Sequence, residues 1–260
     1  MERTPILEAH GLSKQFGAIQ ALEDVDFEVY AGEVVGLVGD NGAGKSTLVK
    51  IISGVYQSET GSILFDGQPV VINKPRDSND LGIETVYQDL ALCDNLDVVA
   101  NLFIGREIPK IKLPILHRLN WLDEAGMEKR AIELLAELHV SLPSVRNLIA
   151  SMSGGQRQSV AVARSVLWDC KVVILDEPTA ALGMEQTRQV KKLITKLRER
   201  NLGVVLISHN LQEILDITDR IIVLRLGRRA ATFKTDSTRP EQIVAAITGV
   251  DRQFEIKASS

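Results

Sequence analysis

The sequence predicts an α/β fold with a mainly parallel core sheet, an antiparallel β part near the N-terminus and an inserted helical region. Three observations predict it: apolar runs too continuous for half-exposed strands, helical patterns between several of these runs, and one long stretch with helical patterns alone. With 260 residues, of which 45% are apolar, the chain suits one large domain or a domain with an inserted subdomain.

The N-terminal part has the pattern of an antiparallel sheet. Apolar and acidic residues alternate from position 24 to 29, which is the period-2 signature of a half-buried strand. Apolar residues at 63–65 and 70–71 flank Asp66-Gly67, a dipeptide that can adopt positive φ. We therefore expect a hairpin at 63–71.

The central strands are predicted by runs that are apolar at every position, which suits strands covered on both faces. These runs occupy residues 34–38, 172–175, 204–207 and 221–224. A helical pattern lies between two of them, with apolar residues at i, i+3, i+4 and i+7, namely Val190, Leu193, Ile194 and Leu197. Strand, crossover helix and strand is the order that builds a doubly wound parallel sheet.

Residues 89–168 show helical patterns alone, and Met127, Ala131, Leu134, Leu135 and Leu138 form one apolar face. We expect a single domain, with 1–88 and 169–260 as the α/β core and 89–168 as an inserted helical subdomain. Residues 106–118 contain prolines and are expected to form an irregular connection, and the polar tail 251–260 is expected to fray.

The charge, aromatic content and cysteine count of the chain argue against several classes of protein. Thirty Lys and Arg against 34 Asp and Glu give a net charge of −4, and aromatics are 4%, a balance that argues against a nucleic-acid binder. Cys93 and Cys170 are too few for a disulfide framework or a four-thiolate metal site, so we expect two reduced thiols. No secretory h-region and no run of ~18 apolar residues is visible, which predicts a soluble, cytosolic chain that reaches a membrane only through a partner.

A phosphate-binding loop is predicted between the apolar run 34–38 and a helical segment at 47–53 that ends at Gly54. The stretch that fits G-x-x-x-x-G-K-[ST] is Gly39-Asp40-Asn41-Gly42-Ala43-Gly44-Lys45-Ser46-Thr47. Its glycines let backbone N–H groups converge on a polyphosphate at a helix N-terminus. We expect Lys45 to bridge the β- and γ-phosphates and the Ser46 hydroxyl to ligate Mg²⁺. The alternative is a tight strand–helix turn with an accidental lysine.

Two acids follow the run 172–175. Asp176 lies where open α/β sheets place ligands, and we expect it to hold Mg²⁺ through water. Successive strand residues point opposite ways, so Glu177 has a different role and can polarise an attacking water. The alternative is that one or both acids merely cap the following turn. An acid pair beside a phosphate loop favours hydrolysis of a nucleoside triphosphate.

A second anion site is predicted at the start of the helical pattern after residue 153. Its sequence is Ser151-Met152-Ser153-Gly154-Gly155-Gln156, a hydroxyl and two glycines at a helix N-terminus. Taken alone, Ser153 could be an ordinary N-cap. Its place downstream of the phosphate loop and upstream of Asp176 makes the motif specific.

Together these residues resemble the nucleotide-binding subunit of ABC transporters, over nearly the whole chain. Residues 152–156 resemble the signature motif of that family, with Met152 in place of the usual Leu. Gln88 resembles its Q-loop glutamine, His209 its switch histidine and Phe16 the aromatic that stacks on adenine. Taken singly, Gln88 could be solvated, His209 could satisfy a local hydrogen bond and Phe16 could belong to the core.

The resemblance implies a head-to-tail dimer, a homodimer here because the chain has one phosphate loop and one signature. Ser153, Gly154 and Gly155, with Gln156 beside them, would contact a γ-phosphate held by the partner's Lys45. It further implies Glu177 as the base, His209 as a stabiliser of γ-phosphate charge, and Gln88 as a ligand and sensor of Mg²⁺. Where many members carry Asp in the D-loop, this chain has Gly183, which puts one cross-interface contact in doubt.

Three sequence segments resemble the corresponding segments of bacterial monosaccharide importers. They are residues 86–92, 95–102 and 177–183. This implies an ATPase on the inner face of the cell membrane that serves a permease and, indirectly, a periplasmic sugar-binding protein. Residues 89–106 are the expected permease-docking surface, with a solvated helix and loop as the alternative. Other hypotheses are an exporter or another transport ATPase, an ABC protein acting on ribosomes or DNA, and a nucleotide switch without hydrolysis.

Overall fold

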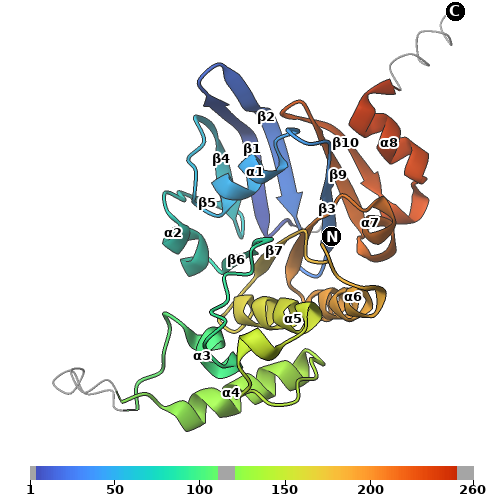
Figure 1. Cartoon of the computed structure of the whole chain (residues 1–260). Coiled ribbons are helices and arrows are strands. Elements are labelled where there is room, and N and C mark those ends of the chain that lie inside the picture. The colour runs from blue at the N-terminus through green and yellow to red at the C-terminus, as the bar shows by residue number, and fades with distance from the viewer. Residues whose placement is uncertain (1–3, 111–120, 251–260) are drawn as a thin grey trace, which may run out of the picture.

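The structure is a computed structural model that describes residues 4–110 and 121–250. Figure 1 shows two sheets in the upper part of the molecule and a group of helices below them. Residues 111–118 of the predicted irregular connection and the predicted frayed tail 251–260 lie outside the described residues. No helix in the described ranges has the length and apolar character needed to cross a membrane.

The antiparallel sheet has the strand order β2-β1-β4-β5. Its strands are β1 (Leu7–Phe16), β2 (Ile19–Val29), β4 (Thr60–Phe65) and β5 (Gln68–Val70). The predicted hairpin is confirmed, because Asp66 and Gly67 connect β4 to β5 with φ of 50° and 71°. A turn with positive φ at both central residues matches the twist of the flanking strands.

The larger sheet has the order β10-β9-β3-β8-β7-β6. Its strands are β3 (Val34–Val38), β6 (Ile83–Val86), β7 (Val172–Asp176), β8 (Gly203–Ile207), β9 (Arg220–Arg225) and β10 (Arg228–Lys234). Neighbouring strands from β6 to β9 are parallel, and β10 is antiparallel to β9. The predicted parallel core is confirmed, with β6 and β10 added at its edges.

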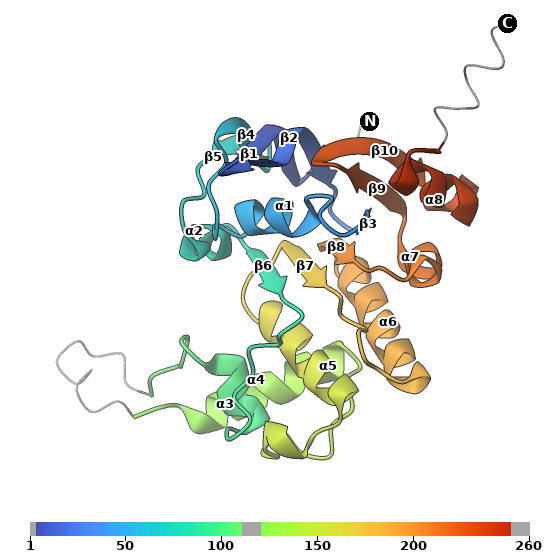
Figure 2. The same cartoon turned by 45° about the horizontal axis from the view of Figure 1, so that its top comes forward.

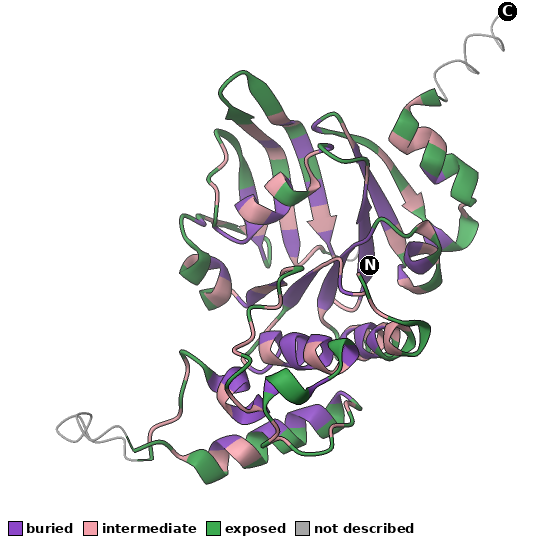
Figure 3. Cartoon of the chain, in the orientation of Figure 1, coloured by how far each residue is buried: buried purple, intermediate pink, exposed green. Residues whose placement is uncertain are grey.

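The apolar runs are explained by burial on both faces of this sheet. Val35 and Leu37 belong to a core shared with the antiparallel sheet and α1 (Lys45–Ile52). Val34 and Val38 belong to the opposite core, which the helices after residue 97 cover. Figure 3 shows the central strands almost wholly in the colour of buried residues. A strand in this position has no solvent face on which to place polar residues.

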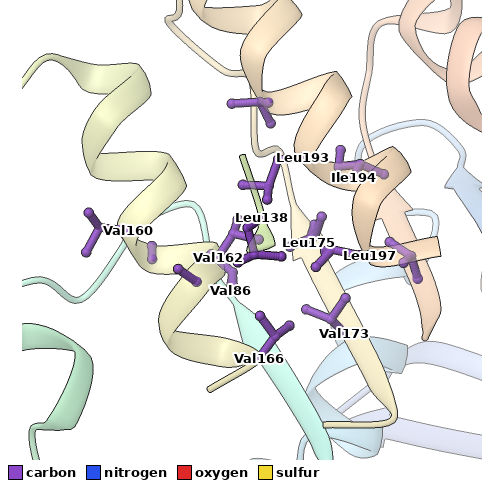
Figure 4. Close-up of a cluster of buried hydrophobic side chains, with 14 of the residues drawn as sticks. Val86, Leu138, Val160, Val162, Val166, Val173, Leu175, Leu193, Ile194 and Leu197 are labelled. Atoms are coloured by element: carbon purple, nitrogen blue, oxygen red, sulfur yellow. The ribbon is translucent and has the colours of Figure 1, made fainter. Parts of the chain in front are cut away.

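The helices of the second core are α3 (Val98–Phe103), α4 (Glu124–Glu137), α5 (Gly154–Ser165), α6 (Met184–Glu199), α7 (Leu211–Ile217) and α8 (Pro240–Thr248). The predicted apolar stripe of α6 is buried throughout, and so is that of α4. Figure 4 shows Val162 of α5, and Val166 just after its end, among buried residues of β7 and α6. This layer fixes the position of the N-terminus of α5 relative to the sheet.

Between β6 and β7 the chain forms α3, α4, a short 3₁₀ turn (Ile149–Ser151) and α5, with isolated bridges at Asp97–Leu148 and Pro109–Leu122. The assignment of 89–168 as a separate subdomain stays a prediction. Figure 2 shows β6, β7 and β8 between α1 on one side and α5 and α6 on the other. The carboxyl ends of parallel strands meet at one edge, so the segments after β3, β7 and β8 gather there.

Candidate functional site

The phosphate loop joins β3 to α1, as predicted. The N-cap of α1 is Gly44, which has no side-chain cap. The first amides of a helix have no acceptor within the helix, so this end of α1 presents N–H donors and a partial positive charge. Lys45 folds back over the loop, where its Nζ donates to the carbonyl oxygens of Gly39 at 2.8 Å and Asp40 at 3.0 Å.

Two glycines of the loop are required by close contacts. Gly39 has φ of 155°, and a Cβ there would lie 2.3 Å from the carbonyl oxygen of Leu224. Gly44 has φ of 104°, and a Cβ there would lie 2.7 Å from the carbonyl oxygen of Ala21. The loop is therefore pressed against β9 and β2, which fixes its curvature around the space above it.

A cavity of about 490 Å³ lies at this loop. It brings together residues that the sequence predicts for the site: Gly39, Asp40, Asn41, Lys45, Glu177 and His209. Its other walls are Val38, Ser208, Leu211 and Ile247, which sequence reasoning did not select. A glycine loop, a lysine, an acid and a histidine thus face one space large enough for a polyphosphate and a water molecule.

Glu177 and His209 are in direct contact within this cavity. Nδ1 of His209 lies 2.8 Å from Oε2 of Glu177, and their side chains are 80% and 18% exposed. Glu177 has φ of 52°, a left-handed conformation that costs a non-glycine residue energy. Its amide nevertheless continues the β7–β8 ladder by donating to the Ile207 carbonyl at 2.9 Å. The turn therefore directs the carboxylate of Glu177 into the cavity while the backbone stays paired.

Charge in the site is only partly compensated. Burial raises the pKa of Asp176, against the opposing effect of Lys45 and Lys50. Burial also lowers the pKa of Lys45, against Glu177, Asp40 and Asp176. Desolvated groups of both signs fit a ligand that brings its own charges, such as a polyphosphate with a divalent cation. Asp176 and the Ser46 hydroxyl offer the oxygen ligands that Mg²⁺ takes.

Several predicted residues lie outside the walls of this cavity, among them Asp176 at the end of β7 and the loop residues 42–44. Phe16 ends β1, is 41% exposed and meets the ring of Tyr56 edge-on at 5.2 Å. Gln88 is exposed two positions beyond the end of β6. Ser46 is exposed in the first turn of α1, beside half-buried Thr47. Their predicted contacts with adenine and Mg²⁺ stay predictions.

The predicted second anion site is the N-terminus of α5. Ser153 is its N-cap: its hydroxyl accepts from the amide of Gln156 at 3.3 Å, and its amide donates to Oε1 of Gln156 at 3.0 Å. A Cβ on Gly154 would lie 3.0 Å from Leu182, and one on Gly155 would lie 2.9 Å from Gln186. Among the described residues, the walls of the phosphate-loop cavity include none of these four.

Gly183 is the N-cap of α6, and its amide donates to Oε1 of Gln186 at 3.2 Å. The start of α6 and the start of α5 are thus packed together through small residues. A side chain at position 155 would therefore collide with Gln186 unless α5 or α6 shifted.

Sequence reasoning missed a polar group behind the cavity. Glu213 on α7 is 2% exposed and accepts hydrogen bonds from the hydroxyls of Thr179 and Ser208. Its position in a short helix next to His209 is a weak signal, because an acid near a helix N-terminus is most often exposed to solvent. Its burial becomes visible only when β7, β8 and α7 are assembled.

Comparison with known proteins gives a consistent result. The sequence profile of the ABC transporter family matches residues 22–180. The fructose import ATP-binding protein FrcA of Rhizobium meliloti is 44% identical over 250 residues, which cover 96% of each chain. The xylose/arabinose import ATP-binding protein XylG of Sulfolobus acidocaldarius is 42% identical over 243 residues, 94% of each chain.

The fold also matches solved structures. One of them is the dimeric post-hydrolysis state of the ATP-binding cassette MJ0796 bound to ADP and Pi. It is 25% identical, with a TM-score of 0.70, over 88% of this chain and 98% of that chain. The two sheets and the helical layer therefore occur together in a protein that holds nucleotide.

Proposed function

Because this chain belongs to the ABC transporter family of ATP-binding subunits, we propose that it hydrolyses ATP to energise the import of a simple sugar through a membrane permease. The observation that carries the hydrolytic part is the cavity in which Lys45, Glu177 and His209 face the phosphate loop. The sugar part is supported by the names of FrcA and XylG, which are fructose and xylose/arabinose import proteins of nearly the same length.

At the phosphate loop, the amides of residues 39–47 bind the phosphates of ATP. Lys45 exchanges the Gly39 and Asp40 carbonyls, on which it rests at 2.8 and 3.0 Å, for the β- and γ-phosphates. Mg²⁺ would be held by Ser46, Asp176 and Gln88, and supplies charge compensation between the phosphates. Phe16 stacks on the adenine, since aromatic faces bind bases of any sequence.

Glu177 is the base that takes a proton from the attacking water. A carboxylate only accepts hydrogen bonds, so the Nδ1–H of His209 is the donor in their 2.8 Å contact. His209 therefore orients the carboxylate. A γ-phosphate oxygen also only accepts hydrogen bonds, so its contact with the other ring nitrogen requires an N–H at Nε2 as well, that is, the imidazolium form of the ring. General-base catalysis of this kind contributes about 10²- to 10⁴-fold in rate.

Two copies of the chain complete the site. The signature residues Ser153 to Gln156 do not line the phosphate-loop cavity of their own described chain. We propose that they close the cavity of a second copy, with the amides of Gly154 and Gly155 donating to its γ-phosphate. The dimeric MJ0796 cassette with ADP and Pi is the relative that supports this arrangement.

The permease docks on residues 89–106, and a periplasmic sugar-binding protein takes part indirectly. A hollow of about 190 Å³ supports this surface, with Leu102, Ile104 and Arg106 among its walls. Arg106 pairs with Glu84 of β6 at 2.9 Å in the same hollow. The chain is then a peripheral protein on the cytoplasmic face of the cell membrane.

Uptake measurements test this function. Cells that lack the chain are complemented with the wild type or with Lys45→Ala, and the uptake of labelled fructose, xylose, arabinose and ribose is compared. We expect one of these sugars to enter only with the wild type. Co-purification from membranes then identifies the permease. Export of a solute in place of sugar uptake supports an exporter, and salt-sensitive binding to nucleic acid supports an ABC protein of ribosomes or DNA.

A further inference from the structure

Glu213 is a buried acid whose partners are hydroxyl groups. Glu213 and Glu33 are the buried carboxylates of the described residues, and Glu33 is paired with Arg220 at 2.8 Å. Oε2 of Glu213 accepts instead from Thr179 Oγ1 at 2.7 Å and from Ser208 Oγ at 2.8 Å. Its Oε1 is buried without a hydrogen-bond partner among the described residues. Burying a carboxyl group with one unpaired oxygen costs free energy of folding, so its presence calls for a structural or functional explanation.

The two hydroxyls belong to the two segments that carry the proposed reacting groups. Thr179 follows Glu177 by two residues in the turn after β7, and Ser208 directly precedes His209 after β8. The last backbone bond between these segments runs from the Glu177 amide to the Ile207 carbonyl. Beyond that bond, one oxygen atom of Glu213 joins both segments.

Helix capping does not account for this carboxylate. Glu213 is the third residue of α7, from which a glutamate commonly reaches back to the amide of the N-cap residue. Here the amide of the N-cap residue Asn210 donates to Ser208 Oγ at 3.1 Å, and the Asn210 side chain caps the helix by itself. Glu213 thus points away from its own helix and toward the two segments.

We propose that Glu213 is a positioning residue that holds Glu177 and His209 in contact by bracing the turn after β7 against the segment after β8. This inference rests on the proposed hydrolytic function. The strained φ of 52° at Glu177 persists only while the surroundings fix the turn, and Thr179 is the group through which Glu213 fixes it. Misplacing a reacting group by about 1 Å can cost on the order of 10²-fold in rate.

Two substitutions separate positioning from folding. Glu213→Gln keeps an oxygen that accepts from both hydroxyls, whereas Glu213→Ala removes it. In the full chain, we expect Glu213→Ala to lower kcat for ATP about 10- to 100-fold with little change in nucleotide affinity, because the phosphate loop is untouched. Glu213→Gln should recover most of kcat. The control is Ser78→Ala on α2 (Pro75–Asp80), outside the walls of the cavity. It removes a buried hydroxyl that donates to the carbonyl oxygen of Ile83 at the start of β6.

Backbone hydrogen exchange tests the positioning role without measuring ATP turnover. Backbone hydrogen exchange of Glu213→Ala should speed up together in residues 177–182 and 207–211, and not in 40–52. Thr179→Val should lower kcat in the wild type but add little in Glu213→Ala, since Glu213→Ala already breaks the hydrogen bond that Thr179→Val removes. Both variants keep the apolar core, and thermal melts verify that they fold.

The inference is overturned if Glu213→Ala keeps the wild-type kcat, or if Glu213→Gln is as impaired as Glu213→Ala. It is also overturned if exchange rises uniformly along the chain, because a merely structural residue would act in that way. If the wild-type chain itself does not hydrolyse ATP, the result bears on the proposed function and not on Glu213 alone. That result removes the proposed function, and the catalytic role of Glu213 with it.

Discussion

Nδ1 of His209 lies 2.8 Å from Oε2 of Glu177, although the two residues are 32 positions apart in the sequence. The contact exists because β7 and β8 are parallel neighbours, so the residues after their carboxyl ends face each other. It holds the Glu177 carboxylate at the cavity of the phosphate loop. A base that is already oriented needs less reorganisation when ATP and water arrive.

Glu177→Gln should retain ATP binding and lose hydrolysis by about 10²- to 10⁴-fold, because an amide cannot accept the proton of water. Binding and turnover are measured on the same preparation by a fluorescent nucleotide and by phosphate release. Glu199→Gln is the matched control, since Glu199 is an exposed acid on α6 that is paired only with Lys196 in the described structure. Near-normal hydrolysis by Glu177→Gln would remove Glu177 as the base.

Lys45→Ala should weaken ATP binding about 10- to 100-fold, as expected for the loss of charged hydrogen bonds worth ~1.5–3 kcal/mol. Titration calorimetry measures the affinity. Lys129→Ala on α4 is the control, because Lys129 is 78% exposed and forms only a weak pair with Glu133 at 3.9 Å. An unchanged affinity of Lys45→Ala would contradict the phosphate-loop assignment.

Asp176→Asn should stabilise the nucleotide-free protein at neutral pH. Burial raises the pKa of Asp176, so the folded state binds more protons than the unfolded state between the two pKa values. Stability therefore falls as the pH rises through that interval, and the penalty is complete above the pKa of Asp176 in the folded state. The gain of Asp176→Asn over the wild type should vanish as the pH falls below the unfolded pKa of about 3.9.

Thermal melts across pH check this expectation, with Asp236→Asn as the control at an exposed acid. Added Mg²⁺ and a non-hydrolysable ATP analogue should stabilise the wild type more than Asp176→Asn, because a proposed metal contact is missing in the variant. If Asp176→Asn is less stable than the wild type at neutral pH without nucleotide, the uncompensated charge proposed for Asp176 is contradicted.

Phe16→Ala should weaken ATP binding about 5- to 100-fold, since stacking of a base on an aromatic ring is worth ~1–3 kcal/mol. Phe16→Trp should retain the affinity. Phe16 is 41% exposed beside Tyr56, so Tyr56→Ala reports whether the edge contact between the two rings matters separately. Equal affinities for Phe16→Ala and the wild type would place adenine elsewhere.

Much of the fold follows from local patterns in the sequence. The runs at 34–38 and 204–207 could be predicted as central strands, because burial on both faces removes polar residues from every position. The hairpin at Asp66-Gly67 could be predicted because few dipeptides accept two positive φ values. Edge strand β10 could not be predicted in this way, since its burial pattern mixes exposed and half-buried residues.

Some residues of the site could be predicted from the sequence and others could not. Lys45 and Ser46 are recognisable because the loop that binds phosphate is contiguous in sequence. Glu177 is recognisable as the second acid after the apolar run 172–175, whereas His209 is recognisable only through the family resemblance. The contact between the two becomes visible only in the assembled sheet. Glu213 and Ile247 could not be found, since their place at the site depends on how α7 and α8 pack against β9 and its neighbours.

The central claim is that each hydrolytic site combines the phosphate loop of one chain with the signature of another, and mixing two inactive variants tests it most directly. Lys45→Ala disables the loop. Ser153→Asp keeps a residue type that can cap α5 but opposes the γ-phosphate with a negative charge, and Ser153→Asn is its neutral control.

Each variant alone should be nearly inactive. A mixed dimer has one intact site, formed by the loop of the Ser153→Asp chain and the signature of the Lys45→Ala chain. An equal mixture should therefore recover about a quarter of wild-type ATP hydrolysis, because half of the randomly formed dimers are mixed. A mixture as inactive as its components would show that each chain uses its own signature, and would contradict the account.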